Sequence, residues 1–310
     1  MKTRITILLA ALLLTTTATQ AQRRMNTHKR NAQRTTARHD RQQTPVTFTT
    51  KDVEMKNAKS GNMLRGTLYL PDTDGKKPLI ITSHELGSDC LRPWWVNYSQ
   101  HWAGMGYAVL GVDYAGGGVR SRSEGKTTDM SVLTEVDDLE QVLCEALTWD
   151  FVDTRHVILI GGSQGGGVAT IVTARHPKEI AAQVLLYPAF HLPDNLRETY
   201  PDLNNLPDTN NRNGMITIGH RYIIDMYNHN YDDDMRNCEC PVLIVHGDAD
   251  KTVPFNVSER AVDIFPHARL HKIEGAGHVF MTPEQQTEFL EQADAFLNRV
   301  VNTQHKRQRR

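Results

Sequence analysis

The stretch Val157–Gly165, with the sequence VILIGGSQG, constrains the fold of this 310-residue chain more than any other. Its first four residues are apolar and mostly β-branched, which predicts a buried strand, and a Gly-x-Ser-x-Gly pattern follows directly. Residues 166–176 then favour a helix. Glycines are needed around Ser163 in such a turn, because the serine backbone is strained and the strand and helix lie very close together. The pattern indicates a reactive serine, although a glycine-rich turn with an incidental serine contains the same five residues.

Two candidate partners of Ser163 lie on predicted strand-end loops, where open α/β sheets place their chemistry. Asp250 follows the apolar strand predicted over residues 241–246, and His278 follows a shorter strand over residues 269–273. A serine hydroxyl is a poor nucleophile at neutral pH and needs a base, which His278 can supply. Asp250 can then hold the imidazole in the correct tautomer.

Asp248 is a rival acid to Asp250. It directly follows Gly247, a position at which Asp commonly makes a hydrogen bond within a turn. We therefore expect Asp250, and not Asp248, to lie beside His278.

A further strand is predicted over residues 79–83, and it runs into His84-Glu85-Leu86-Gly87. In a site of this kind, backbone N–H groups stabilise the oxyanion that forms on the substrate. We expect one donor to be the N–H of Gln164, directly after the serine, and the other to be the N–H of Leu86. His84 is expected to hold the loop in place rather than to take part in the chemistry.

The chain order Ser163, Asp250, His278 and the surrounding motifs resemble the α/β-hydrolase superfamily. Within it, the chain looks similar to bacterial cinnamoyl or feruloyl esterases and to related serine aminopeptidase-like hydrolases. The resemblance implies an α/β-hydrolase fold, with a mostly parallel central sheet, helices on both faces and a short lid insertion. It also implies ester hydrolysis through an acyl-enzyme, with no cofactor and no metal. The matching stretches are residues 84–87, 106–113, 161–166, 246–254 and 275–278.

Two residues depart from the usual pattern of these esterases. The family usually has glycine after the histidine of the oxyanion loop, whereas this chain has Glu85. The elbow often carries histidine where this chain has Gly162. The first departure affects the backbone path that presents Leu86, and the second removes a side chain next to the nucleophile but no catalytic group.

Four regions are expected along the chain. Residues 1–21 have a basic start, a short apolar run and a Thr-Gln-Ala end, which is typical of a signal peptide and too short for a membrane span. Residues 22–45 are basic and poor in large apolar side chains, which predicts a disordered linker. The α/β-hydrolase domain is expected over residues 46–301, followed by a basic disordered tail over residues 302–310.

The charges are unevenly distributed, although the formal net charge is only −1. Most of the acids lie in the expected domain, and a large share of the Lys and Arg residues lies at the two ends. These basic ends could contact an anionic envelope or polysaccharide surface, or they could be solvated tails without a specific partner.

Residues 189–239 interrupt the alternation of strands and helices and are predicted to form a lid over the active-site mouth. A helix is expected near residues 219–227. An aminopeptidase would need an acidic pair in this lid to capture a free amine, and Glu198 and Asp202 are the candidates. Several apolar side chains could line an aryl-acyl pocket, or could simply pack the lid onto the core: Phe190, Tyr200, Met215, Tyr222, Met226, Tyr227 and Tyr231.

The four cysteines leave the disulfide pattern open. Export would permit a disulfide between distant members of the set, whereas Cys238 and Cys240 are too close in sequence to pair easily with each other. The remaining two are Cys90 and Cys144. No spacing of His and Cys is typical of a zinc site.

These features predict an exported serine hydrolase, periplasmic or secreted, that cleaves hydroxycinnamoyl or short-chain acyl esters. Its substrate is expected to be a small-molecule or polysaccharide-linked ester, and no nucleic-acid partner is expected. The alternative is a serine peptidase of the aminopeptidase or dipeptidyl-peptidase kind, acting on short peptides. A third hypothesis, a non-catalytic binding protein, would have no need of Ser163, Asp250 and His278 together.

Overall fold

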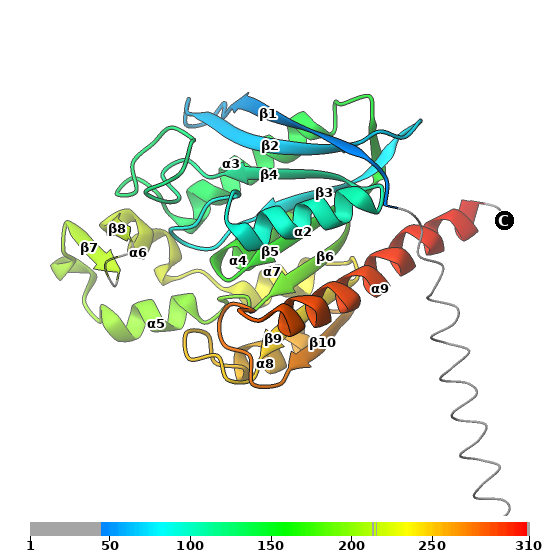
Figure 1. Cartoon of the computed structure of the whole chain (residues 1–310). Helices are drawn as coiled ribbons and strands as arrows, with labels where there is room; N and C mark the ends of the chain where they lie inside the picture. Colours follow the sequence, from blue (N-terminus) through cyan, green and yellow to red (C-terminus); the bar gives the residue numbers. More distant parts are fainter. Residues whose placement is uncertain (1–44, 213, 215, 309–310) are drawn as a thin grey trace, which may run out of the picture. The chain divides into compact units, whose positions relative to one another are not determined.

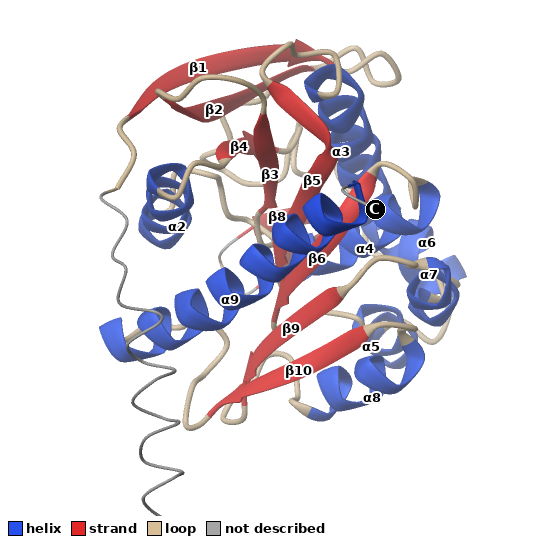
Figure 2. Ribbon diagram, turned by 90° about the vertical axis from the view of Figure 1, so that its right-hand side faces the viewer, coloured by secondary structure: helices blue, strands red, loops and turns tan. Residues whose placement is uncertain are grey.

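An eight-stranded sheet organises the described part of the chain, which is residues 45–212, 214 and 216–308 of a computed structural model. The strand order is β1-β2-β4-β3-β5-β6-β9-β10 (Figures 1 and 2). The β1–β2 and β2–β4 pairs are antiparallel, and all other neighbours in this sheet are parallel. The strands are β1 Phe48–Lys56, β2 Met63–Pro71, β3 Lys77–Ser83, β4 Ala108–Asp113, β5 Val152–Gly162, β6 Ile180–Leu186, β9 Val242–Gly247 and β10 Ala268–Ile273.

Helices cover both faces of the sheet, because the parallel strands are apolar at almost every position. Successive side chains of a strand point to opposite faces. In β3, Leu79 and Ile81 pack into one buried cluster and Ile80 packs into the other. One face is covered by α2 (Pro93–Gly104) and α9 (Pro283–Gln308), and the opposite face by α3 (Val132–Ala146), α4 (Gln164–Arg175) and α8 (Asn256–Ile264) (Figure 2). The fold is the α/β-hydrolase fold that the sequence predicted.

The C-terminal helix is longer than expected. The sequence predicted the end of the domain at residue 301 and a disordered tail over 302–310, but α9 continues to Gln308. Residues 302–308 contain neither glycine nor proline, so no helix-breaking residue ends α9 earlier. The predicted signal peptide and all but the last residue of the predicted linker lie outside the described residues.

The segment between β6 and β9 contains the predicted lid. Its elements are α5 Leu192–Thr199, the 3₁₀ helix η1 Leu203–Asn205, β7 Thr209–Arg212, β8 Ile216–Gly219, α6 His220–Tyr227 and α7 Tyr231–Asn237. Helix α6 was predicted, whereas the β7–β8 pair was not. Several hydrogen bonds tie this segment to the body of the protein, two of them to the loop before α3. The Thr127 hydroxyl donates to the Thr217 carbonyl at 2.6 Å, and the Ser131 hydroxyl donates to the Asp225 carboxylate at 2.5 Å.

The turn between β5 and α4 brings three backbone segments into very close contact. A Cβ on Gly161 would lie 2.4 Å from the carbonyl oxygen of Gly165. A Cβ on Gly165 would lie 2.2 Å from the carbonyl oxygen of Ser83 and 2.4 Å from that of His84. Between these glycines, Ser163 has φ +52°, which is rare for any residue with a side chain. The turn therefore needs its glycines for steric reasons.

We expect Gly165→Ala to lower the free energy of unfolding by about 3 kcal/mol, because the new methyl group would overlap two carbonyl oxygens. Chemical denaturation followed by circular dichroism measures this loss. The matched control is Gly277→Ala, where a Cβ would meet no atom within 4 Å. Equal stability of the two variants would contradict the steric argument.

Candidate active site

Ser163, His278 and Asp250 lie together at the carboxyl end of the parallel strands. His278 Nε2 is 3.0 Å from Ser163 Oγ, and His278 Nδ1 is 2.7 Å from Asp250 Oδ2. Ser163 and Asp250 are buried, and His278 is half-buried. The three residues come from three separate strand-end loops and are brought together only by the parallel sheet.

Asp250 is held as a carboxylate by several donors. Its Oδ1 accepts the backbone N–H groups of Thr252 and Val253, at 2.7 and 3.0 Å. Burial on its own raises the pKa of this carboxyl group, but hydrogen bonds from His246, His278 and Val253 outweigh burial and hold the pKa well below its usual range. The carboxylate is therefore ionised at neutral pH and can stabilise an imidazolium at His278.

His246 belongs to this network, although the sequence analysis did not single it out. It is fully buried at the end of β9, and its Nε2 is 3.1 Å from both Asp250 Oδ2 and the Val253 carbonyl. Its Nδ1 is 2.7 Å from the Ser258 hydroxyl. Because Nε2 faces two acceptors, the proton is assigned to Nε2 and Nδ1 accepts from Ser258. The sequence did contain one indication of this role, because His246 is a polar residue at the end of an otherwise apolar strand.

Leu86 and Gln164 lie on the two backbone segments that meet at the elbow, the loop after β3 and the start of α4. Gln164 is the first residue of α4, and the first N–H groups of a helix have no acceptor within it. Leu86 follows β3 on the loop against which Gly165 packs, and in the described residues its N–H has no hydrogen-bond acceptor. These two groups are the ones that the sequence predicted as oxyanion donors.

The Gln164 side chain connects the elbow to α3 and to the lid. Its Nε2 donates to Glu135 Oε2 at 2.7 Å, and its Oε1 accepts the Tyr222 hydroxyl at 2.5 Å. Burial raises the pKa of the Glu135 carboxyl group well above its usual range, while the hydrogen bond from Gln164 partly opposes this. The residue after Ser163 is thus fixed by side chains from two other elements.

Glu85 and Gly162, the two departures from the esterase pattern, turn out to be in contact. A Cβ on Gly162 would lie 2.9 Å from Glu85 Oε1 and 3.2 Å from Trp95 Cζ2. The Glu85 side chain therefore occupies space that any side chain at position 162 would need. The two departures form a single feature of this site.

His84 takes the structural role that was expected of it. His84 Nδ1 is 2.9 Å from the Glu85 carbonyl, and its Nε2 accepts the Tyr114 N–H at 3.2 Å, which holds the loop after β3. Asp248 does not bond within its own turn as predicted: its carboxylate accepts the Gly275 N–H at 2.7 Å from the loop after β10, while Asp250 makes the contact with His278.

A second histidine near His278 was also missed. His191 lies at the start of α5, is half-buried, and its Nδ1 is buried without a hydrogen-bond partner in the described residues. Burial lowers its pKa, while the Thr252 backbone and the Asp250 charge raise it and the His278 charge lowers it further. His191 and His278 are far apart in sequence, so no local pattern predicted that they would be neighbours. Only the fold brings the start of α5 to the loop that carries His278.

The predicted lid residues are mostly committed to packing. Phe190, Tyr222, Met226 and Tyr231 are buried in the core, and Met215 lies outside the described residues. Tyr200 and Tyr227 are partly exposed and pack against the edge of the core. Of the two candidate amine-binding acids, Asp202 accepts bonds from Asn204 and Asn205 of its own turn, and Glu198 is exposed on α5.

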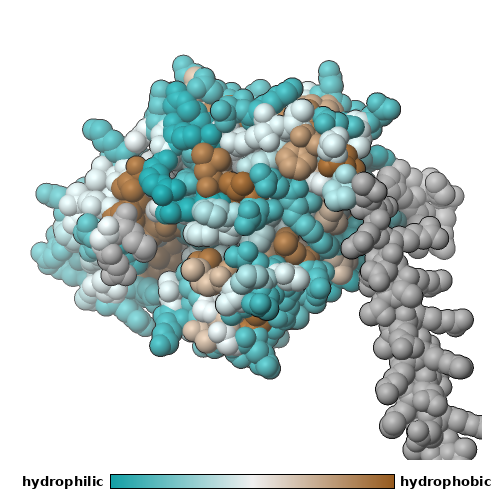
Figure 3. Space-filling view, in the orientation of Figure 1, coloured by the Kyte–Doolittle hydropathy of each residue, from teal (hydrophilic) through white to brown (hydrophobic). Residues whose placement is uncertain are grey.

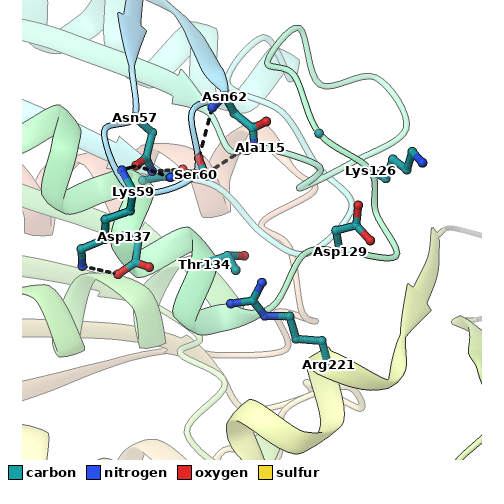
Figure 4. Close-up of a pocket in the computed structure, with 12 residues that line it drawn as sticks. Asn57, Lys59, Ser60, Asn62, Ala115, Lys126, Asp129, Thr134, Asp137 and Arg221 are labelled. Atoms are coloured by element: carbon teal, nitrogen blue, oxygen red, sulfur yellow. Dashed lines mark hydrogen bonds and ion pairs between the residues drawn. The ribbon is translucent and has the colours of Figure 1, made fainter.

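Other possible sites are separate from Ser163. All four cysteines are free. The described residues contain no cluster of three or more His, Cys, Asp or Glu side chains that could hold a metal, and none of their helices combines the length and apolarity needed to cross a membrane. A polar cavity of about 710 Å³ lies between the β1–β2 turn, the N-terminal part of α3 and Arg221 of α6, and it includes neither Ser163 nor His278 (Figure 4).

Comparisons with known proteins place the chain among hydrolases. Residues 94–304 match the prolyl oligopeptidase family, Peptidase_S9. A monoacylglycerol lipase from Mycolicibacterium smegmatis is 25% identical over 252 residues, which cover 71% of this chain and 87% of the lipase. The quorum-quenching protein AidA from Acinetobacter baumannii is 29% identical over 118 residues, which cover 38% of this chain and little more than a third, 37%, of AidA.

A solved structure gives a closer match to the whole fold. Est1E from Butyrivibrio proteoclasticus, with ferulic acid bound, superposes with a TM-score of 0.70 and 25% identity, covering 78% of this chain and 99% of Est1E. These similarities confirm the predicted resemblance to cinnamoyl esterases and identify the chain as a hydrolase. Because the family match covers well over half of its residues, the chain belongs to the prolyl oligopeptidase family of α/β-hydrolases.

Proposed function

We propose that the chain hydrolyses carboxylic esters through an acyl-enzyme on Ser163. The observation that carries this proposal is the geometry of the three side chains, with His278 Nε2 3.0 Å from Ser163 Oγ and Nδ1 2.7 Å from Asp250. Both distances are those of hydrogen bonds that transfer or orient a proton. Asp250 is the orienting acid in this proposal, and His246 keeps Asp250 in place.

The reaction proceeds in two halves. Ser163 Oγ attacks the ester carbonyl carbon while His278 takes its proton, and the N–H groups of Leu86 and Gln164 stabilise the negative oxygen. The C–O bond to the alcohol then breaks, and His278 gives its proton to the leaving oxygen. Water next attacks the acyl-enzyme, again with His278 as the base, and releases the acid and free Ser163.

An ester substrate with an apolar acyl group is supported by two observations. The proteins to which the chain is similar include a monoacylglycerol lipase and an esterase, Est1E, with ferulic acid bound. In this chain, exposed large apolar side chains follow the ends of strands at the Ser163 side of the sheet: Leu91, Val119 and Met281. The visible surface otherwise shows small apolar patches separated by polar residues (Figure 3).

Peptide hydrolysis is the second candidate, because the family that matches residues 94–304 is a peptidase family. The chemistry at Ser163 would be the same, with an amine in place of the alcohol. The proposed lid acids Glu198 and Asp202 give this alternative little support, since Asp202 is occupied by its own turn.

Ser163→Ala is expected to lower kcat for p-nitrophenyl butyrate by about 10⁴-fold or more, because no other group in the site can form the acyl-enzyme. A fluorophosphonate should add covalently to the wild-type protein and not to the variant, as measured by intact-protein mass. Retention of hydrolysis by the variant would overturn the proposed mechanism.

A substrate panel separates the two candidate functions. We expect methyl ferulate and p-nitrophenyl acetate to be hydrolysed, and aminoacyl and dipeptidyl p-nitroanilides to be poor substrates, because the candidate amine-binding acid Asp202 is already bonded within its own turn. Values of kcat/KM for each substrate measure the preference. Turnover of the anilides without turnover of the esters would favour the peptidase.

We also propose that the protein is exported, on the basis of the basic start, apolar run and Thr-Gln-Ala end of residues 1–21. Expression of the full chain in a bacterium with intact secretion should give a mature protein that begins at Gln22. Intact mass and N-terminal sequencing of the periplasmic and culture fractions measure this, and a full-length cytoplasmic product would contradict it.

A further inference from the structure

Glu85 is a buried carboxylate beside the nucleophile that the reaction above does not use. The residue is 9% exposed, and none of the side chains that hydrogen-bond to its carboxylate in the described residues is a cation. Three neutral donors surround it instead. Oε1 accepts from Trp94 Nε1 at 3.3 Å and from the Tyr187 hydroxyl at 3.2 Å, and Oε2 accepts from Trp95 Nε1 at 3.0 Å. A buried charge without a cation is costly, so this arrangement calls for an explanation in terms of the site.

The carboxylate touches two parts of the proposed machinery. It is the residue before Leu86, and its Oε1 fills the space next to Gly162, directly before Ser163. It therefore holds the loop that carries one oxyanion donor against the elbow that carries the nucleophile.

Glu85 also reaches His278 through one ring. Tyr187, whose hydroxyl donates to Glu85, packs on the His278 imidazole with ring centroids 4.8 Å apart. Tyr187 has φ +38°, a strained backbone for a residue with a side chain, and its N–H donates to the Val245 carbonyl at 2.9 Å. The hydrogen bond to Glu85 anchors the far end of this ring.

We propose that Glu85 is a positioning residue for the hydrolytic site: it locks the oxyanion loop against the elbow and the Tyr187 ring against His278, and its charge favours the imidazolium. The proposal rests on the proposed function of Ser163 and His278. It does not require Glu85 to touch the substrate, and the contacts that carry it are with Gly162, Trp94, Trp95 and Tyr187.

The negative charge of Glu85 predicts the direction in which the pH profile of activity should move when that charge is removed. The groups that face His278 are Asp250, Ser163, Tyr187 and His191, with Glu85 behind Tyr187. Removing one negative charge from this set makes the imidazolium less favourable. Activity that needs neutral His278 should then persist to lower pH.

Glu85→Gln keeps the size of the side chain and removes its charge. We expect kcat for p-nitrophenyl butyrate to fall about tenfold to a hundredfold with KM changed little, because misplaced catalytic groups affect the transition state most. We also expect the acid limb of the pH–kcat/KM profile to move to lower pH by roughly half a unit. An unchanged kcat, or an acid limb that does not move, would overturn the proposal.

Two further variants separate charge from packing. Glu85→Asp keeps the charge but is too short to reach all three donors, so kcat should fall while the acid limb stays in place. Tyr187→Phe keeps the ring on His278 and removes only its anchor, so kcat should fall even if Glu85→Gln does not fold. Wild-type kcat in Tyr187→Phe, or an acid limb displaced equally in the Asp and Gln variants, would overturn the proposal.

The contact between Glu85 and Gly162 predicts non-additive mutations. Gly162→Ala should lower both stability and kcat in the wild-type protein, because its Cβ would lie 2.9 Å from the carboxylate. The same change should cost less in a Glu85→Ala background, where only the 3.2 Å approach to Trp95 Cζ2 remains. Strict additivity in this double-mutant cycle would show that the two residues do not share space and would contradict the proposal.

Asp153→Asn is the matched control for loss of a buried carboxylate. Asp153 is 8% exposed, bonds Arg155 and His156, and lies at the start of β5, the opposite end of the strand from Ser163. It should lower the melting temperature without moving the acid limb. If the acid limb of the pH–kcat/KM profile also moved in Asp153→Asn, the shift in Glu85→Gln would not be specific to Glu85, and the proposal would be overturned. Ser163→Ala, measured in parallel, distinguishes failure of the proposed function from failure of the Glu85 proposal.

Discussion

The close approach of β3, β5 and α4 at the elbow is the constraint on which the rest of the site depends. Gly161 and Gly165 leave no room for a Cβ, because the carbonyl groups of Gly165, Ser83 and His84 occupy the space. The same contact that strains Ser163 brings the loop after β3 next to the start of α4. The nucleophile and both proposed oxyanion donors are therefore positioned by one packing arrangement of backbone atoms, and side-chain identity matters less there.

Around this backbone contact, side-chain networks hold the reacting groups from several directions. Asp250 is fixed by two N–H groups and by His246, so its orientation toward His278 does not depend on His278 alone. Gln164 is fixed by Glu135 of α3 and Tyr222 of α6. The second network connects the elbow to the segment between β6 and β9, which makes this segment part of the site's support as well as its proposed lid.

Glu85 shows how a family pattern can change at two positions at once. The Glu85 carboxylate on the loop after β3 is compatible with the elbow only if the residue before Ser163 has no side chain, and Gly162 meets that condition. The carboxylate then requires donors, which the indoles of Trp94 and Trp95 and the hydroxyl of Tyr187 provide. None of these residues indicates a special role by its type alone. Their role becomes visible only in the contact between the Glu85 carboxylate, its three donors and Gly162.

The sequence by itself determined the fold class and predicted that Ser163, Asp250 and His278 would come together, because both inferences follow from local patterns and their order along the chain. Apolar runs predict buried strands, and the order of Ser163, Asp250 and His278 along the chain identified the α/β-hydrolase plan. Only the tertiary structure revealed His246, His191 and the meaning of Glu85, since these residues act through contacts with elements far away in sequence. The β7–β8 pair and the length of α9 were also missed, because short strands and helix ends depend on packing more than on local preference. The sequence gives the chemical type of each side chain. The groups that contact it are decided by the tertiary structure, because most of them come from segments distant in sequence.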